Sequence, residues 1–303
     1  MSIGVVVVTY NRKEMLKKAL ECFDRQTVKP AYIVVVDNAS TDLTSEFLKK
    51  WKLENKAYKN YIITMDKNLG GSGGFYTGLR FAQNLKSDWI WVSDDDAFPE
   101  KNALEVAEKY TNKEYAAICG TVINNGKIDI DHRRKYKREK FRLKPISFPA
   151  SVYKQEKFEI ECFSYVGTII NKNKLKLAGL TRKEYFIWMD DTEHSLRLHK
   201  FGKIYCIPAI RVHHDTGFNV NNKPTWKTYY GIRNTADMYK RNFPYKYYIY
   251  YCYGNLIKST IGILTKRNTV YNRIKRKALF DAIHGRMGID NTYKPGWKYS
   301  EKG

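Results

Sequence analysis

Apolar and polar positions alternate along the first 120 residues in a way that predicts buried strands separated by amphipathic helices. Residues 3–9 and 31–36 are almost continuous apolar runs, which are typical of strands buried on both faces of a sheet. Residues 12–25 carry apolar side chains at helical spacing, namely Met15, Leu16, Ala19, Leu20 and Phe23. A strand, a helix and a second strand are therefore expected to open the chain.

The alternation continues to residue 93. We expect four further elements, which are a helix at 41–51, a strand at 61–64, a helix at 74–85 and a strand at 89–93. Ser40 or Thr41 would cap the first of these helices. Because strands and helices alternate at this pitch, the sequence predicts an α/β fold with a mostly parallel central sheet flanked by helices.

The pattern resumes after residue 150 and changes character beyond Pro224. We expect a strand at 163–170, a helix at 191–201, and strands near 203–207 and 209–213. The remainder is basic, rich in tyrosine and predicted to be helical, so we divide the chain into residues 1–220 and 221–303. One apolar stripe is expected in the second region, formed by Ile257, Ile261, Leu264, Tyr271, Ile274, Ala278 and Ala282. Basic residues crowd beside it: Lys266, Arg267, Arg273, Lys275, Arg276 and Lys277.

Composition indicates a globular chain without a membrane span. With 303 residues, 43% of them hydrophobic, the chain can bury a sizeable core. Its longest apolar runs are far shorter than the roughly 18 to 20 residues that cross a bilayer. A strand-like run follows Met1 directly, without a signal-peptide pattern, so we expect a cytoplasmic protein. The five cysteines form no CxxC pair, which favours reduced thiols over zinc ligands or disulfides.

The net charge of +23 calls for an anionic partner, such as nucleic acid, an anionic membrane surface or a phosphorylated substrate. Two segments supply most of the excess. Residues 131–144 hold eight Lys or Arg against two acids, and residues 241–303 hold thirteen against three.

Three of the expected strands end in polar side chains. These are Thr9, Tyr10, Asn11 and Arg12 after the first strand, Asp37, Asn38 and Ser40 after the second, and Asp94, Asp95 and Asp96 after the fourth. In open α/β sheets, ligands bind beyond the carboxyl ends of the strands. The three clusters therefore predict a binding site at one edge of the sheet.

The three consecutive carboxylates repel one another unless a cation neutralises them. Asp94 and Asp96 can face one Mg²⁺ or Mn²⁺ ion, while Asp95 could hold a ribose hydroxyl. The alternative is a solvated acidic turn that caps a helix beginning near Pro99. Asp37 offers acceptor oxygens suited to a nucleobase edge and ribose hydroxyls, or else it caps the helix that follows.

Four segments in this order resemble a known family. VVVVTYNR (5–12), VVVDNASTD (34–42), NLGGSGG (68–74) and WVSDDDA (91–97) are similar to inverting glycosyltransferases of the GT-A fold, family 2, over roughly residues 1–217. The resemblance implies a Rossmann-like sheet with a C-terminal helical extension. It also implies that Thr9, Asp37 and Asp95 contact the nucleoside of a sugar nucleotide, and that Asp94 and Asp96 serve a divalent metal.

The glycine run fits neither of the common phosphate-binding loops. No Gly-Lys-Ser/Thr follows it, and Tyr76 stands where a dinucleotide fingerprint has its third glycine. We interpret it as a close backbone approach to the sugar nucleotide, with free amides available as donors. The expected contacts are Asn68, Gly70, Gly71, Gly73 and Gly74, in addition to Tyr10, Asn11, Arg12 and Asn38 from the strand ends.

The family pattern for a general base falls on WMDDTEHSLRL (188–198). Aligned on Leu196 and Arg197, it implies that Asp191 is the base, with Asp190 beside it. A positioned carboxylate that removes the proton of a sugar hydroxyl contributes about 10² to 10⁴ in rate. Alternatively, these acids only favour the positive end of the helix dipole. We assign the acceptor to three neighbouring side chains: Trp188, Glu193 and His194.

Two histidines end a strand in RVHHDTG (211–217). Family members often place a metal-binding His in an H-x-x-G setting here, which implies His214 with Gly217. His213 remains an alternative, and a structural role remains possible for both.

The doubled glycines of GG-x-GG-F most resemble galactofuranosyltransferases, and YYGIRN (229–234) resembles an element that galactofuranosyl and rhamnosyl transferases share. The resemblance implies UDP-galactofuranose as donor, with dTDP-rhamnose as the alternative, and a saccharide acceptor linked to polyprenyl diphosphate. The basic C-terminal stripe would then lie on the anionic inner face of the membrane, or pack on the core or on a second copy of the chain.

Two other classes of protein compete with this interpretation. A nucleic-acid-binding protein is suggested by the charge and the 24 tyrosines, but the basic residues avoid the strand-end clusters and no known module is present. A sugar nucleotidyltransferase would carry a glycine-rich basic loop after its first strand, where this chain has TYNRKE. We therefore expect no nucleic-acid partner.

Overall fold

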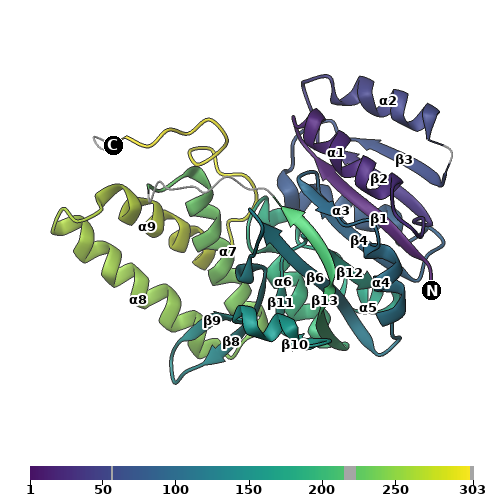
Figure 1. Ribbon diagram of the computed structural model, residues 1–303. Coiled ribbons are helices and arrows are strands. Elements are labelled where there is room, and N and C mark those ends of the chain that lie inside the picture. Colours follow the sequence, from purple (N-terminus) through teal and green to yellow (C-terminus); the bar gives the residue numbers. More distant parts are fainter. Residues whose placement is uncertain (56, 215–222, 301–303) are drawn as a thin grey trace.

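The computed structural model describes residues 1–55, 57–214 and 223–300, which form a central sheet flanked by helices with a helical C-terminal region beside it (Figure 1). The sheet runs in the order β10-β13-β6-β12-β4-β1-β2-β3, with β5 on β13 and β7 on β6. Its strands are β1 (Ile3–Thr9), β2 (Tyr32–Asp37), β3 (Lys59–Thr64), β4 (Trp89–Asp94), β5 (Ala97–Pro99), β6 (Tyr115–Asn124), β7 (Lys127–Ile128), β10 (Phe158–Ile160), β12 (Thr168–Asn171) and β13 (Lys203–His214).

A smaller sheet lies beside the central one, in the order β11-β8-β9. Its strands are β8 (Arg133–Arg138), β9 (Leu143–Ser147) and β11 (Cys162–Phe163). The helices are α1 (Lys13–Asp24), α2 (Thr44–Glu54), α3 (Gly70–Ala82), α4 (Ala103–Tyr110), α5 (Lys172–Ala178), α6 (Asp190–His199), α7 (Trp226–Asn242), α8 (Tyr245–Leu264) and α9 (Thr269–Ile283).

The predicted α/β class is confirmed. β1, β2, β3 and β4 are all parallel neighbours, and β13 is parallel to β6. β12 joins the two halves of the sheet because it pairs antiparallel with both β4 and β6. The carboxyl ends of β1, β2 and β4 therefore share one edge, which is where the sequence places its polar clusters.

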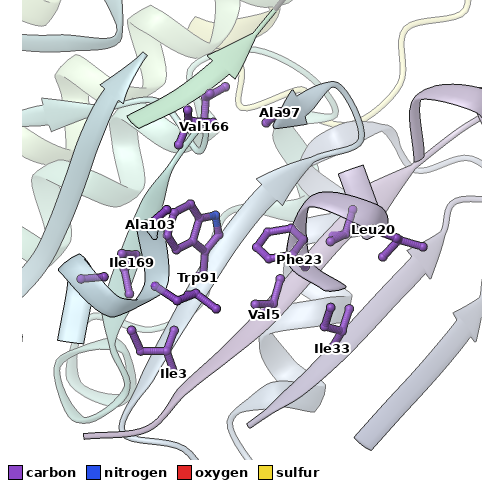
Figure 2. Close-up of a cluster of buried hydrophobic side chains, with 14 of the residues drawn as sticks. Ile3, Val5, Leu20, Phe23, Ile33, Trp91, Ala97, Ala103, Val166 and Ile169 are labelled. Atoms are coloured by element: carbon purple, nitrogen blue, oxygen red, sulfur yellow. The ribbon is translucent and has the colours of Figure 1, made fainter. Parts of the chain in front are cut away.

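Hydrophobic cores lie on both faces of the sheet because side chains alternate along each strand. Val5 and Val7 of β1 face α1 together with Trp91, whose ring meets that of Phe23 edge-on at 5.9 Å (Figure 2). Each fully buried side chain of this size contributes about 1.5–3 kcal/mol. Val6 of β1 instead joins the core under α3.

Helix α3 packs closely on β1 because glycines line its inner face. A Cβ atom at Gly74 would lie 2.4 Å from Val8 Cγ1, and one at Gly78 would lie 2.4 Å from Val6 Cγ1. The helix also begins at Gly70, four residues before the predicted start. The glycine run is therefore the first turn of a helix and not the loop that the sequence suggested.

The predicted cap of α2 is wrong. Ser40 and Thr41 are held by Asn11, whose backbone N–H donates to Ser40 Oγ at 3.0 Å and whose Oδ1 accepts from Thr41 N–H at 2.7 Å. The helix begins at Thr44, whose N–H donates to Asp42 Oδ1 at 3.0 Å.

Two predicted strand patterns also differ. The expected strand at 163–170 is divided between β11 and β12, with Gly167 between them at a φ of 65°. The two strands expected at 203–213 are one strand, β13, whose register with β6 shifts between Cys206 and Arg211. Pro208 lies within that shift. Proline has no backbone N–H to donate to a neighbouring strand, which accounts for the interruption of the pairing at this point.

The predicted C-terminal stripe is split between two helices. Ile274, Ala278 and Ala282 of α9 are buried in the C-terminal helices. In contrast, Ile257 and Leu264 of α8 are 61% and 77% exposed. Within the described residues, no helix combines the length and apolar character needed to cross a membrane.

Candidate active site

The acidic triad follows β4 and is held by residues that follow β1 and end β13. Asp95 accepts a hydrogen bond from Thr9 Oγ1 at 2.7 Å, and Arg12 Nη1 lies 3.3 Å from its other oxygen. Arg12 also pairs with Asp96 at 2.6 Å, and His214 Nε2 lies 3.2 Å from Asp96. The residues at the ends of β1 and β4, which the sequence placed at one edge of the sheet, are therefore in direct contact.

The three carboxyl groups have very different affinities for a proton. Burial, together with the charge of Asp96, raises the pKa of Asp94 to about 7. Burial also raises the pKa of Asp95 to about 6, although Thr9 and Arg12 oppose it. Burial alone would raise the pKa of Asp96, but His214 and Arg12 overcome it and lower the value to about 2. Of these three carboxyl groups, Asp94 therefore has the negative charge that its surroundings compensate least.

A pocket of about 280 Å³ opens beside the triad, and we call it the triad pocket. Its lining combines expected residues with some from the C-terminal region: Val8, Thr9, Tyr10, Arg12, Asn38, Asn68, Gly70, Gly71, Asp94, Asp95, Phe186, Ile187, Trp226, Lys227 and Pro295. Sequence patterns gave no signal for Trp226, Lys227 and Pro295 because long-range packing brings them to this edge.

Several predicted nucleotide contacts serve the protein itself. Asp37 is fully buried, and its oxygens accept from Ser40 N–H and Ser45 Oγ, both at 2.9 Å. The structure thus supports the alternative in which Asp37 fixes the start of the α2 segment. Asn38 lines the triad pocket, but its amide donates to Gly70 O at 2.9 Å and its Oδ1 accepts from Leu69 N–H.

Asn11 is also taken up by the protein, because it holds the segment before α2 and is not among the residues that line the triad pocket. Asn68 is better placed for a ligand: it lines the pocket while its Oδ1 accepts from Gly70 N–H at 2.7 Å.

The four glycines of the run divide by what surrounds them. Only at Gly71 would an added Cβ atom meet nothing within 4 Å, and Gly71 lines the triad pocket. A Cβ at Gly70 would lie 1.9 Å from the carbonyl oxygen of Phe186. Gly73 and Gly74 do not line the triad pocket, and their predicted contacts with the ligand stay predictions. Gly73 faces Leu69 and Gly74 faces Val8. Because these two glycines have no side chain, Leu69 and Val8 can pack closely against them.

A second pocket, of about 380 Å³, contains the pair Asp190 and Asp191, and we call it the acid-pair pocket. It is lined by Gly71, Phe75, Asp94, Arg134, Ser164, Tyr165, Ile187, Trp188, Met189, Asp190, Asp191 and Thr192. Gly71, Asp94 and Ile187 line both pockets. The two pockets are therefore neighbours that share a wall at the triad.

The two acids of the pair differ in their surroundings. Burial and the adjacent charge of Asp191 raise the pKa of Asp190 to about 8, so Asp190 is largely protonated at neutral pH. Burial also raises the pKa of Asp191, but Arg134 and hydrogen bonds from Thr192 favour its carboxylate form. Asp191 is thus the better proton acceptor of the two.

Arg134 and His132 were missed by sequence reasoning, which treated residues 131–144 only as a charge excess. Arg134 lines the acid-pair pocket and donates to Thr192 Oγ1 at 3.3 Å. The ring of His132 packs edge-on against that of His214, with centroids 5.4 Å apart. The run gave no period-two signal for these residues, since β8 buries Arg133 and Tyr136, which are three positions apart.

The segment before the acid pair has an unusual backbone. Phe186, Trp188 and Met189 have φ values of 65°, 63° and 69°. Such conformations cost about 1–3 kcal/mol each in residues other than glycine and persist only where the surroundings impose them. Trp188 is 47% exposed and lines the acid-pair pocket, and its role as an acceptor contact stays a prediction.

Helix α7 holds this segment through the YYGIRN motif. The side-chain amide of Asn234 donates to the carbonyl oxygens of Tyr185, Ile187 and Trp188 at 2.9–3.0 Å. A Cβ atom at Gly231 would lie 2.8 Å from the Trp188 ring, so the glycine allows that ring to rest on the helix. The motif thus positions the segment that leads into the acid pair.

Glu193 and His194 are wrongly predicted as acceptor contacts. Both are fully buried. Glu193 is paired with Arg197 at 2.9 Å and with Arg182 at 3.2 Å. His194 Nδ1 lies 2.8 Å from Tyr165 Oη, and burial lowers the pKa of the imidazole to about 3. Both side chains point into the protein because α6 is covered on the face that bears them.

The two histidines that end β13 lie on opposite sides of the strand. His213 Nε2 contacts Glu100 at 3.1 Å and is not in the triad, whereas His214 contacts Asp96. The structure therefore favours His214 over His213 as a metal ligand. Gly217, the glycine of the expected H-x-x-G setting, lies outside the described residues.

Asp94, Asp96 and His214 supply the oxygen and nitrogen donors that suit Mn²⁺ or Mg²⁺. Burial and the charge of Asp96 raise the pKa of Asp94, and a bound cation would oppose that shift. Across the described ranges, however, no three His, Cys, Asp or Glu side chains lie close enough together to hold a metal ion. The donor chemistry fits a divalent cation, and the metal assignment stays a prediction.

Comparison with known proteins supports the family resemblance. Residues 4–177 match the family model described as Glycosyl transferase family 2. Galactofuranosyltransferase GlfT1 of Mycolicibacterium smegmatis is 36% identical over 97 residues, covering 32% of this chain and 30% of the relative. The O-antigen chain rhamnosyltransferase WbaN of Salmonella anatum is 29% identical over 122 residues, covering 39% and 36%. The matching region thus spans only about a third of the length of either relative.

Among solved structures, GalNAc-T7 with UDP, GalNAc and Mn²⁺ superposes with a TM-score of 0.66 at 16% identity. The superposition covers 94% of this chain and 56% of GalNAc-T7. At this identity the similarity shows a shared fold.

Proposed function

Because the chain belongs to glycosyl transferase family 2, we propose that it moves galactofuranose from UDP-galactofuranose to a hydroxyl group of a saccharide acceptor, with inversion at the anomeric carbon. The observation that carries this proposal is the shared wall between the triad pocket and the acid-pair pocket. A sugar nucleotide in the first pocket would present its sugar to an acceptor in the second.

In the proposed reaction Asp191 accepts the proton of the acceptor hydroxyl, whose oxygen forms a bond to the anomeric carbon as the bond to the diphosphate breaks. Trp188 offers an aromatic face on which a sugar of the acceptor can pack. Asp94, Asp96 and His214 would hold Mn²⁺ or Mg²⁺, which offsets the charge on the departing diphosphate. Gly71 leaves room for the transferred sugar beside the triad.

The donor follows from the sequence match to a galactofuranosyltransferase, together with GG-x-GG-F and YYGIRN. A rhamnosyltransferase that uses dTDP-rhamnose is the second candidate, favoured by the match to an O-antigen chain rhamnosyltransferase. Thermal-shift measurements with UDP, dTDP and GDP, each with and without Mn²⁺, separate the two donors. We expect the largest stabilisation from UDP with Mn²⁺, because a ligand that binds only the folded state stabilises it, and at equal concentration the tighter ligand stabilises it more.

Transfer is then measured with UDP-galactofuranose and dTDP-rhamnose on a polyprenyl-diphosphate-linked saccharide. Stabilisation by dTDP in preference to UDP would favour the rhamnosyl donor. Stabilisation by oligonucleotides and by none of the nucleotides would instead support a nucleic-acid-binding protein.

We also propose that the C-terminal helices attach the protein to the anionic inner face of the cell membrane, where a lipid-linked acceptor would reside. Ile257, Ile261 and Leu264 are more than half exposed on α8. Lys258, Lys266 and Arg267 are exposed beside them. Exposed apolar side chains bordered by cations are the combination that binds anionic lipid surfaces. A second copy of the chain is the other occupant that could cover this face.

Replacing Lys258, Lys266 and Arg267 with Gln is expected to weaken binding to phosphatidylglycerol vesicles on the order of 100-fold, as measured by flotation, because each of the three cations contributes about 1 kcal/mol near such a surface. Flotation of the wild-type protein and of the triple variant is compared at one ionic strength. The matched control changes Lys49, Lys50 and Lys52 of α2, which are exposed far from α8 in the sequence. Equal flotation of all three proteins would count against membrane attachment through this face.

A further inference from the structure

The first turn of α7 places a lysine at the triad pocket. Trp226 and Lys227 both line that pocket, although they belong to the C-terminal region. A capping box fixes this turn: Thr225 N–H donates to Thr228 Oγ1 at 3.0 Å, and the Thr225 side chain accepts from the backbone of Thr228. The Trp226 ring packs against that of Phe186, with centroids 6.0 Å apart. The position of Lys227 is therefore set by ordered structure on both sides.

Among the residues that the structure describes, the ammonium group of Lys227 has no carboxylate partner. It lies over the ring of Trp226 at 5.7 Å, and it forms no ion pair with any residue in the described segments. Burial lowers its pKa and the charge of Arg12 lowers it further, while Asp96 and Asp94 act in the opposite direction. Lys227 is thus close enough to Arg12 and to the triad for their charges to change its pKa.

An uncompensated cation in a half-buried site is unfavourable until an anion joins it. Two cations, Arg12 and Lys227, line the pocket together, and Arg12 is already paired with Asp95 and Asp96. Lys227 is the one whose charge remains available to a ligand. Because it lies near the metal-binding end of the pocket, the anion that fits is the diphosphate and not the base of a nucleotide.

We propose that Lys227 donates to the diphosphate of the bound sugar nucleotide, so that the C-terminal region completes the donor site. This inference rests on the proposed function. The bond is charge-assisted and strengthens as the sugar leaves, because the diphosphate then gains negative charge. Lys227 is accordingly a binding residue for both the donor and the nucleoside diphosphate that is released.

The test compares the affinities of UDP and uridine for wild-type protein and for Lys227→Gln, by calorimetry in the presence of Mn²⁺. We expect the substitution to weaken UDP binding about tenfold or more, since hydrogen bonds to charged groups are worth this factor. Uridine binding should change less than twofold. A role in packing alone would weaken both ligands alike, so the ratio of the two affinities identifies the diphosphate contact.

Two further variants serve as controls. Lys240→Gln removes the same charge from an exposed position on the same helix and should leave both affinities unchanged. Lys227→Arg keeps the charge and should retain most of the preference for UDP over uridine. Melting temperatures verify that each variant is folded.

Three outcomes would overturn the proposal. The first is unchanged UDP affinity in Lys227→Gln. The second is an equal loss for UDP and uridine, and the third is a loss in Lys240→Gln as large as that in Lys227→Gln. If wild-type protein binds neither UDP nor another nucleotide, the proposed function falls and this inference falls with it. The inference alone falls if wild type binds UDP and Lys227→Gln binds it equally well.

Discussion

Replacing Asp191 with Asn is expected to lower the rate of sugar transfer by about 10² to 10⁴, with UDP affinity nearly unchanged. The amide cannot take the proton of the acceptor hydroxyl, but it has the shape of the carboxylate, and Asp191 does not line the triad pocket. The rate is measured at saturating donor and acceptor, and UDP affinity by calorimetry.

Asp190→Asn provides the comparison. The pKa of Asp190 is raised to about 8, so this residue is already largely neutral at pH 7 and its replacement should cost much less. Wild-type turnover by folded Asp191→Asn protein, or a larger loss in Asp190→Asn, would show that the base has been assigned to the wrong acid.

The pH dependence of the wild-type rate should report the same group. The pKa of Asp191 is raised by burial, so the rate should be lost as pH falls through a value above the ordinary 3.8 of an aspartate. The charge of Arg134 lowers that pKa. In Arg134→Ala protein the pKa should rise further, and the acidic limb of the profile should move to higher pH. A limb that moves to lower pH would contradict this arrangement.

Replacing Asn234 with Ala is expected to lower the free energy of unfolding by about 3 kcal/mol and to slow transfer at least tenfold. One amide donates to three carbonyl groups of the 185–188 segment. The Tyr185 carbonyl also accepts from Ile187 N–H at 2.8 Å, so the substitution chiefly affects the carbonyls of Ile187 and Trp188, and a buried carbonyl without a partner costs about 1–3 kcal/mol. The released segment would no longer hold Trp188 and the acid pair in place, and misplacement by about 1 Å can cost 10² in rate.

Urea unfolding and steady-state rates measure the two effects of this substitution. Asn255→Ala is the matched control, because Asn255 makes a single hydrogen bond, to Tyr251 O within α8. We expect it to cost about 1 kcal/mol or less and to leave transfer unchanged. If Asn234→Ala is as stable and active as the control, α7 does not position the acid pair.

The spacing of apolar residues along the sequence predicted the strands and helices whose formation depends on neighbouring residues. The apolar runs at β1 and β2 and the helical spacing of α1 appear within one or two residues of their predicted bounds. The acidic triad could be recognised in the sequence because three adjacent carboxylates after a strand repel one another unless a cation neutralises them. The resemblance implied His214 with His213 as the alternative, and the structure favours His214 because adjacent strand residues point in opposite directions.

Other predictions failed where tertiary packing decides what a side chain does. Glu193 and His194 look like solvent-facing acceptor contacts in the sequence, yet α6 turns both into the protein, Glu193 toward Arg182 and His194 toward Tyr165. Gly73 and Gly74 suggest room for a ligand, but that room is filled by Leu69 and Val8. No periodicity reveals which buried surface will face a glycine, so these residues could not be sorted from sequence.

The contacts between α7 and the segment before the acid pair limit how chimeras of such proteins can be designed. Gly231 and Asn234 are matched to the backbone at 185–188, whose left-handed residues would be strained without them. A chimera that exchanges the C-terminal helices with those of a relative should therefore carry 184–191 along with 226–242. A junction placed between these two segments would separate an unusual backbone from the helix that enforces it.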